Sequence, residues 1–112
     1  MSHTAVVSLV IPDGETDSSA LSEVWSSGQA RSALGGAKRV WVAAGAEFGI
    51  EVRQSYGSGG WLDLLGDDGS VVKTVADGLM PLPEHVAIED IRFVAAEAVS
   101  GDATITISMM VC

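Results

Sequence analysis

Three aspartates gather in the segment WLDLLGDDG, where carboxylate oxygens could hold a calcium ion. Calcium takes roughly six to eight oxygen ligands, which an EF-hand supplies from alternating positions of a long loop. Asp63, Asp67 and Asp68 depart from that spacing, and the loop between them is too short to wrap an ion. Asp-Gly pairs also form hairpin turns, because Asp accepts backbone donors and Gly adopts positive φ. We therefore predict a tight turn at GDDG in preference to a metal site.

A second acidic group lies in the segment PDGETDSS, where Asp13, Glu15 and Asp17 occupy alternate positions. Nothing in the sequence brings this group against the aspartates of the first segment. The segment is rich in turn-forming residues and has no apolar periodicity, which is typical of a solvated loop. We predict a loop here too.

Other candidate chemistry is incomplete. The run GSGG at Gly57–Gly60 lacks the Lys-Ser/Thr pair of a phosphate-binding loop and does not open a helix, so it reads as a hairpin tip. His3 and His85 have no second histidine at ligand spacing and no evident serine or cysteine nucleophile. We predict a protein without catalytic residues, cofactor or metal.

The three tryptophans, Trp25, Trp41 and Trp61, could stack against sugar rings, but large rings more often fill a core or a subunit interface. Core or interface is the favoured prediction. The alternative is a carbohydrate-binding module that recognises host-surface glycans. Its site would combine an aromatic platform with acidic hydrogen-bond acceptors, namely Tyr56, Trp61, Asp63 and Asp67.

Composition restricts the partners. The chain has 112 residues and a formal net charge of -9, with its few basic residues scattered, so nucleic acid and anionic membranes are unfavourable partners. The single cysteine, Cys112, is the last residue and cannot form an internal disulfide. The apolar stretch near the N-terminus is too short and too interrupted for a signal peptide or a membrane span. We expect one domain, residues 1–112, made in the cytoplasm.

Strands are the elements that must position these residues. Apolar and polar residues alternate in FGIEVRQSY (48–56) and ATITISMMV (103–111), which is the period of a strand with one buried face. Shorter runs rich in β-branched and aromatic residues occur at TAVVSLVI, KRVWVAA, WLDLL, SVVKTVA and DIRFVAA. Their spacing predicts an all-β antiparallel sandwich, jelly-roll or Greek-key like, with about seven to eight strands and little helix. For Ser18–Leu34 a strand, a single helical turn and a long loop all remain open.

Two parts of the chain are similar to known proteins. The segment IEVRQSYGSGGWLDLLGDDGSVV resembles the strand, Gly turn, Trp, acidic-Gly turn, strand pattern of short β-sandwich virion proteins of tailed bacteriophages. The segments IPDGETDSSAL and IEDIRFVAAEAVSGDATITI resemble the opening and closing of the same proteins. A looser similarity links the Gly turn, its Trp and the late IRFV strand to discoidin-like, galactose-binding sandwiches.

The phage resemblance implies a structural virion protein that decorates the capsid exterior or serves as another head or tail accessory. Such a protein acts by burying surface against itself, as a trimer or dimer, and against a capsid or other virion protein, where many modest contacts add up. Its location would be the virion. The apolar residues without an evident core role are the predicted interface: Val7, Leu9, Trp25, Met109 and Met110.

Overall fold

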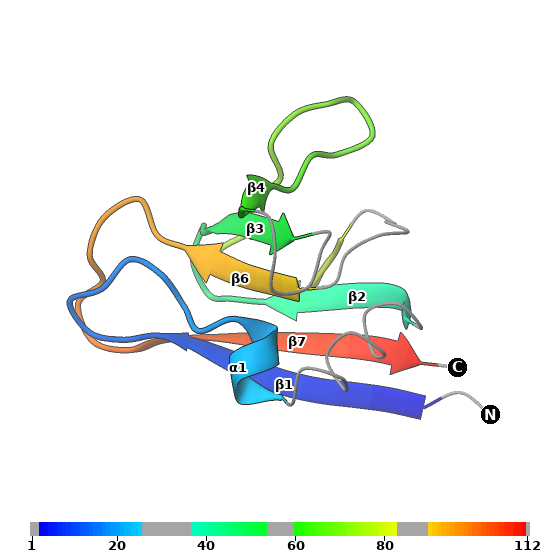
Figure 1. The fold of residues 1–112 in the computed structure, drawn as a ribbon, viewed down its shortest axis with the longest axis horizontal. Coiled ribbons are helices and arrows are strands. Elements are labelled where there is room, and N and C mark those ends of the chain that lie inside the picture. Colours follow the sequence, from blue (N-terminus) through cyan, green and yellow to red (C-terminus); the bar gives the residue numbers. More distant parts are fainter. Residues whose placement is uncertain (1–2, 26–36, 54–59, 83–89, 112) are drawn as a thin grey trace.

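A computed structural model describes residues 3–25, 37–53, 60–82 and 90–111. These residues form two antiparallel sheets, drawn in Figure 1. The first sheet has the order β1 (His3–Ile11), β7 (Ala103–Val111), β2 (Ala37–Ala43), β5 (Met80–Pro81). The second has the order β4 (Leu62–Asp63), β3 (Gly49–Arg53), β6 (Asp90–Val94). The predicted all-β, antiparallel, sandwich-like fold with little helix is confirmed.

The first and last strands form the longest pairing of the fold. β1 and β7 are matched without a register shift from His3 opposite Val111 to Ile11 opposite Ala103. The start of β1 and the end of β7 therefore lie side by side (Figure 1). The alternation seen in the sequence of β7 is the observed one, because Ile105, Ile107 and Met109 are fully buried.

The core lies between the two sheets and is filled mainly from one face of β1, β2, β3, β6 and β7. Burying one such side chain contributes roughly 1.5–3 kcal/mol, so this layer is the main source of stability. The described core consists of Leu9, Ile11, Leu21, Val42, Phe48, Ile50, Val52, Leu64, Leu82, Ile91, Phe93, Ala95, Ile105, Ile107 and Met109.

Two strand predictions need correction. The run SVVKTVA (70–76) does not form a strand and makes only isolated bridges, which pair Leu65 with Val71 and Gly49 with Lys73. Its backbone is held by Thr74, whose Oγ1 donates to the Ala46 carbonyl at 2.6 Å and accepts from the Phe48 N–H at 2.7 Å. The run WLDLL contributes only the short strand β4, and β5 was not predicted at all.

The segment left open in the sequence contains a single helical turn, α1 (Leu21–Val24), while residues 26–36 lie outside the described part. Ala20 precedes this turn and has no side chain that could cap it. The missing acceptor comes from β6, where the Asp90 Oδ1 accepts the Ser22 N–H at 3.1 Å. The helical turn therefore depends on a residue far away in the sequence.

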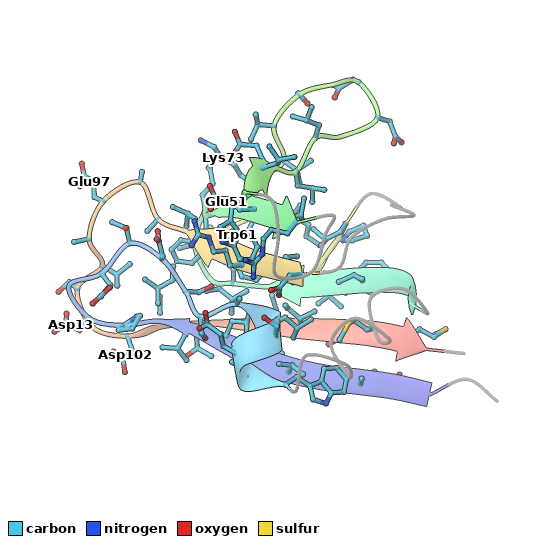
Figure 2. All side chains as sticks on the ribbon, viewed as in Figure 1. Asp13, Glu51, Trp61, Lys73, Glu97 and Asp102 are labelled. Carbon is cyan, nitrogen blue, oxygen red and sulfur yellow. The ribbon has the colours of Figure 1, made fainter. Side chains whose placement is uncertain are left out.

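Asp13, Glu15 and Asp17 of the loop after β1 are exposed, as predicted, while Ser18 is buried where the loop reaches the second sheet. Its residues Thr16–Ser18 run beside β6: the Ser18 N–H donates to the Phe93 carbonyl at 2.8 Å, and the Ala95 N–H donates to the Thr16 carbonyl at 2.7 Å. At the loop tip the Asp13 N–H donates to the Asp102 Oδ1 at 2.9 Å. Asp13 and Asp102 lie together at the left of Figure 2. No helix of the described residues is long and apolar enough to cross a membrane.

Candidate functional surfaces

One face of the protein is formed by the outer side of the four-stranded sheet. Because alternate residues of β1 and β7 fill the core, the residues between them point away from it. We call this surface the uncharged face, since none of its described side chains is ionised. Its members are Thr4, Val6, Ser8 and Val10 of β1, Thr104, Thr106, Ser108 and Met110 of β7, and Trp41 and Ala43 of β2.

The register arranges this face in rows across the sheet. Val6 lies opposite Ser108, which lies opposite Trp41 on the other side of β7. In the next row the hydroxyls of Ser8 and Thr106 are 3.5 Å apart. Arg39 follows at the end of the face, opposite Met110, and its side chain lies outside the described part. A surface on which no described side chain is charged, on a chain of net charge -9, is suited to contact with another protein.

The predicted interface residues divide between this face and the core. Leu9 and Met109 are fully buried between the sheets, so neither side chain is available to a partner, which corrects the prediction for these two. Val7 and Trp25 are partly buried and pack against the core. Met110 is 49% exposed and lies on the uncharged face. Val6, which is 62% exposed, also belongs to this face, whereas the sequence analysis predicted the adjacent residue, Val7.

The outer side of the three-stranded sheet has the opposite character. We call the group Glu51, Arg53, Trp61, Asp90 and Arg92 the Trp61 cluster. Cross-strand neighbours alternate in sign here, with Arg53 opposite Asp90 and Glu51 opposite Arg92. Arg92 binds Glu51 Oε1 through Nε and Nη2, both at 2.7 Å. The Trp61 ring lies against both arginines, whose Cζ atoms are 4.1 Å (Arg53) and 4.6 Å (Arg92) from its centre.

Asp90 is the centre of this cluster, and its side chain is 0% exposed. Its Oδ2 accepts from Arg53 Nη2 at 2.6 Å and from the Ser22 Oγ at 2.7 Å. Its Oδ1 accepts from the backbone N–H groups of Ser22 at 3.1 Å and Ile91 at 3.0 Å. A buried carboxylate needs such donors, because desolvation otherwise disfavours the charge. The arrangement joins β3, β6 and α1.

This geometry bears on the predicted glycan site. Tyr56 lies outside the described residues, while Asp63 and Asp67 are exposed. The Trp61 side chain is half-buried and is labelled in Figure 2 beside Glu51, next to β6. Two guanidinium groups already lie against the ring, so part of its surface is occupied by Arg53 and Arg92. Trp61 thereby packs over the charged pairs of the sheet.

The GDDG segment forms the predicted turn. The Gly69 N–H donates to the Gly66 carbonyl at 3.0 Å, the Gly66 N–H donates to the Ser70 carbonyl at 2.8 Å, and Gly69 has φ +83°. The Asp68 Oδ1 accepts from the Ser70 Oγ at 2.6 Å and from the Ser70 N–H at 3.0 Å. Asp68 is thus used as a turn former. Among the described residues, no group of three or more His, Cys, Asp or Glu could hold a metal ion.

The turn should respond to acid through Asp68. Hydrogen bonds from the Ser70 hydroxyl and then from its backbone N–H hold the pKa of the Asp68 carboxyl below its ordinary value of 3.8. A lowered pKa means that the carboxylate stabilises the folded turn above pH 3.8, and that this stabilisation is lost as the pH falls through the lowered pKa. We expect an NMR titration to give a pKa below 3.8 for Asp68 and a higher one in Ser70→Ala. An unchanged pKa in Ser70→Ala would contradict the assignment.

The chain after β4 rises away from the sheets as a loop (Figure 1) and returns to β3, where Lys73 bridges Gly49 and the Thr74 N–H donates to the Phe48 carbonyl. We call residues 62–79, from β4 to the residue before β5, the projecting loop. It carries both charged and apolar side chains, and Lys73 and Glu47 form an ion pair of 3.8 Å at its base. Most of the large apolar side chains that are exposed in the described structure belong to it: Leu62, Leu65, Val71, Val75 and Leu79.

Sequence reasoning missed the charged members of the Trp61 cluster. Alternation in β3 indicates that Glu51 and Arg53 face outward, but it does not say which charges stand opposite them on β6. Asp90 is harder to find, since nothing local distinguishes it from an exposed aspartate at the start of a strand.

Comparison of the chain with protein-family models, with curated proteins and with solved structures finds no match.

Proposed function

We propose that this protein is a non-enzymatic structural component of a tailed-bacteriophage virion that decorates the exterior of the capsid. The observation that carries the proposal is the distribution of exposed apolar side chains. They gather on the projecting loop, with Leu65 and Val71 at 46% and 50% exposure, and on the uncharged face, with Val6 and Met110. Exposed apolar groups gathered in this way are typical of protein–protein contact.

The two surfaces suit two kinds of contact. The projecting loop reaches beyond the sheets and combines apolar tips with charges, so it can enter a depression on a capsid protein. The uncharged face and the adjoining edge of β1 suit contact between copies. Each chain has a net charge of -9, so two copies repel one another through their acidic surfaces and approach best where no described side chain is charged. The similarity of Ile50–Val72 to phage sandwich proteins adds support. A carbohydrate-binding role has less, because the face of Trp61 meets arginines.

We expect the protein to be found on particles. The test replaces the phage gene with a tagged copy, purifies the particles and measures the bound protein per particle, with immunogold imaging to separate capsid from tail. Polar substitutions in the projecting loop, Leu65→Asn with Val71→Thr, should lower the bound amount at least tenfold at equal expression.

A matched control is Val24→Thr, which changes a residue of similar exposure (51%) on α1, away from the projecting loop. It should leave occupancy unchanged. Absence of the wild-type protein from purified particles would overturn the virion role. Label confined to the tail would overturn the capsid position. An equal decrease in the bound protein for the loop variant and for Val24→Thr would show that the projecting loop does not make the contact with the capsid.

A further inference from the structure

We propose that the free edge of β1 pairs with the β1 edge of a second copy of this chain, antiparallel, about a two-fold axis beside Val6. The resulting dimer has one continuous sheet that runs through both copies. The inference deepens the proposed function by naming the contact between copies, and it rests on that function for the dimer's biological role.

Among the residues that the structure describes, β1 is the only long strand whose outer edge is open over most of its length, with Val10 alone bound there, by Ser19. β4 and β5, the edge strands at the other ends of the sheets, are two residues each. The outer edge of β6 is covered by Thr16–Ser18. β1 has nine residues and pairs with β7 on one side. A long regular strand edge presents unpaired N–H and C=O groups, and these are a template for a further strand.

The direction of the backbone groups can be read from one hydrogen bond. The Val10 carbonyl accepts the Ser19 N–H at 3.3 Å, on the side away from β7. Since backbone groups alternate along a strand, those of Thr4, Val6 and Ser8 point to the same outer edge. All three residues are exposed, Val6 at 62%. The pairing with β7 has no register shift, so the edge is not interrupted by a bulge.

A second copy fits this edge better than a strand of another sequence for two reasons. The strand HTAVVSLVI contains no Asp, Glu, Lys or Arg, so two copies meet there without like charges in direct opposition, although each chain has net charge -9. The strand is also self-complementary about Val6. Antiparallel pairing there places Val6 opposite Val6 of the other copy and Thr4 opposite Ser8, with about six backbone hydrogen bonds.

The first experiment measures mass against concentration by analytical ultracentrifugation. The wild type should change from 11.5 kDa to twice that mass as its concentration rises. Val6→Asp, which places two carboxylates in opposition at the axis, should raise the dissociation constant at least tenfold. Met110→Asp is the matched control: it adds the same charge to the same face, but on β7, whose two edges are already paired.

The outcomes separate edge pairing from its alternatives. Edge pairing predicts that only Val6→Asp weakens the dimer, whereas stacking of two uncharged faces predicts equal weakening by both variants and overturns the proposal. A wild type that stays monomeric at millimolar concentration also overturns it. Circular dichroism and thermal melting confirm that both variants are folded. If Val6→Asp fails to fold, Val6→Pro replaces it, because proline at an edge removes the outward N–H with little disturbance.

A second experiment tests the register. In a Cys112→Ser background, Val6→Cys should form a disulfide-linked dimer under mild oxidation, because directly opposed residues in such a pair lie about 5.5 Å apart at Cα. Met110→Cys should not. A linked dimer of Met110→Cys at the same rate overturns the register. If the protein dimerises but is absent from particles, the edge pairing stands and the virion role is overturned. If the protein is monomeric but present on particles, the virion role stands and the edge pairing is overturned.

Discussion

Replacing Asp90 with alanine is expected to lower the free energy of unfolding by about 3 kcal/mol. The carboxylate is fully buried and accepts hydrogen bonds from Arg53, from the backbone and hydroxyl of Ser22, and from the backbone of Ile91. Its removal leaves the Arg53 guanidinium without its partner and the first turn of α1 without its acceptor. This loss of unfolding free energy is at the lower end of the range for a broken buried ion pair, because the Arg53 side chain is 22% exposed and can reach water.

Urea unfolding followed by tryptophan fluorescence and by circular dichroism measures this change. The control is Asp63→Ala, an exposed aspartate on β4, which should change stability by no more than about 0.5 kcal/mol. The stability of Asp90→Asn should fall between those of Asp90→Ala and Asp63→Ala, since an amide oxygen can still accept hydrogen bonds from the backbone. A double-mutant cycle with Arg53→Met isolates the pair. Equal stability of Asp90→Ala and Asp63→Ala would contradict the role assigned to Asp90.

Thr74→Val is expected to lower the free energy of unfolding by about 2–3 kcal/mol, although the two side chains have nearly the same shape. The Thr74 hydroxyl donates to the Ala46 carbonyl and accepts from the Phe48 N–H, and the residue is 3% exposed. Valine fills the space but leaves both backbone groups unpaired, and Phe48 is buried, so water cannot replace the hydroxyl there. The projecting loop would lose the side-chain part of its attachment near the connection between β2 and β3 and keep the bond from the Thr74 N–H to the Phe48 carbonyl.

Two variants test this reasoning. Thr74→Ser keeps the hydroxyl and should retain most of the stability. Thr104→Val makes the same change on the exposed side of β7 and should stay within about 0.5 kcal/mol of the wild type. Hydrogen exchange should show the Phe48 amide losing protection in Thr74→Val alone. Equal effects of the changes at Thr74 and Thr104 would mean that the hydroxyl of Thr74 is not what holds the loop.

The stabilising role of these two residues connects the fold to the proposed surfaces. Asp90 secures the sheet that carries the Trp61 cluster, and Thr74 secures the base of the projecting loop. Neither residue lies on the uncharged face. Variants at Val6 and Met110 therefore report on association, while variants at Asp90 and Thr74 report on folding.

The local alternation of apolar and polar residues was sufficient to predict the strands that have one buried face. The alternation in residues 103–111 predicted the burial of Ile105 and Ile107, and the alternation in residues 48–56 predicted that of Phe48, Ile50 and Val52. The turn at GDDG was also predictable, because Asp and Gly form such a turn with their own backbone. The prediction for residues 70–76 was wrong: their β-branched composition suits a strand, but only isolated backbone bridges form, and the Thr74 side chain supplies the other bonds.

The sequence by itself determined the fold class, the turn chemistry and the absence of charge in β1 and β7, because these depend on neighbouring residues and their period. Only the tertiary structure decided which face of β1 and β7 is available, so that Leu9 and Met109 went to the core and Val6 and Met110 to the surface. It also decided that Trp61 meets two arginines and that Asp90 caps α1. These outcomes depend on which strands pair and in which register, and pairing between residues tens of positions apart leaves no local signal in the chain.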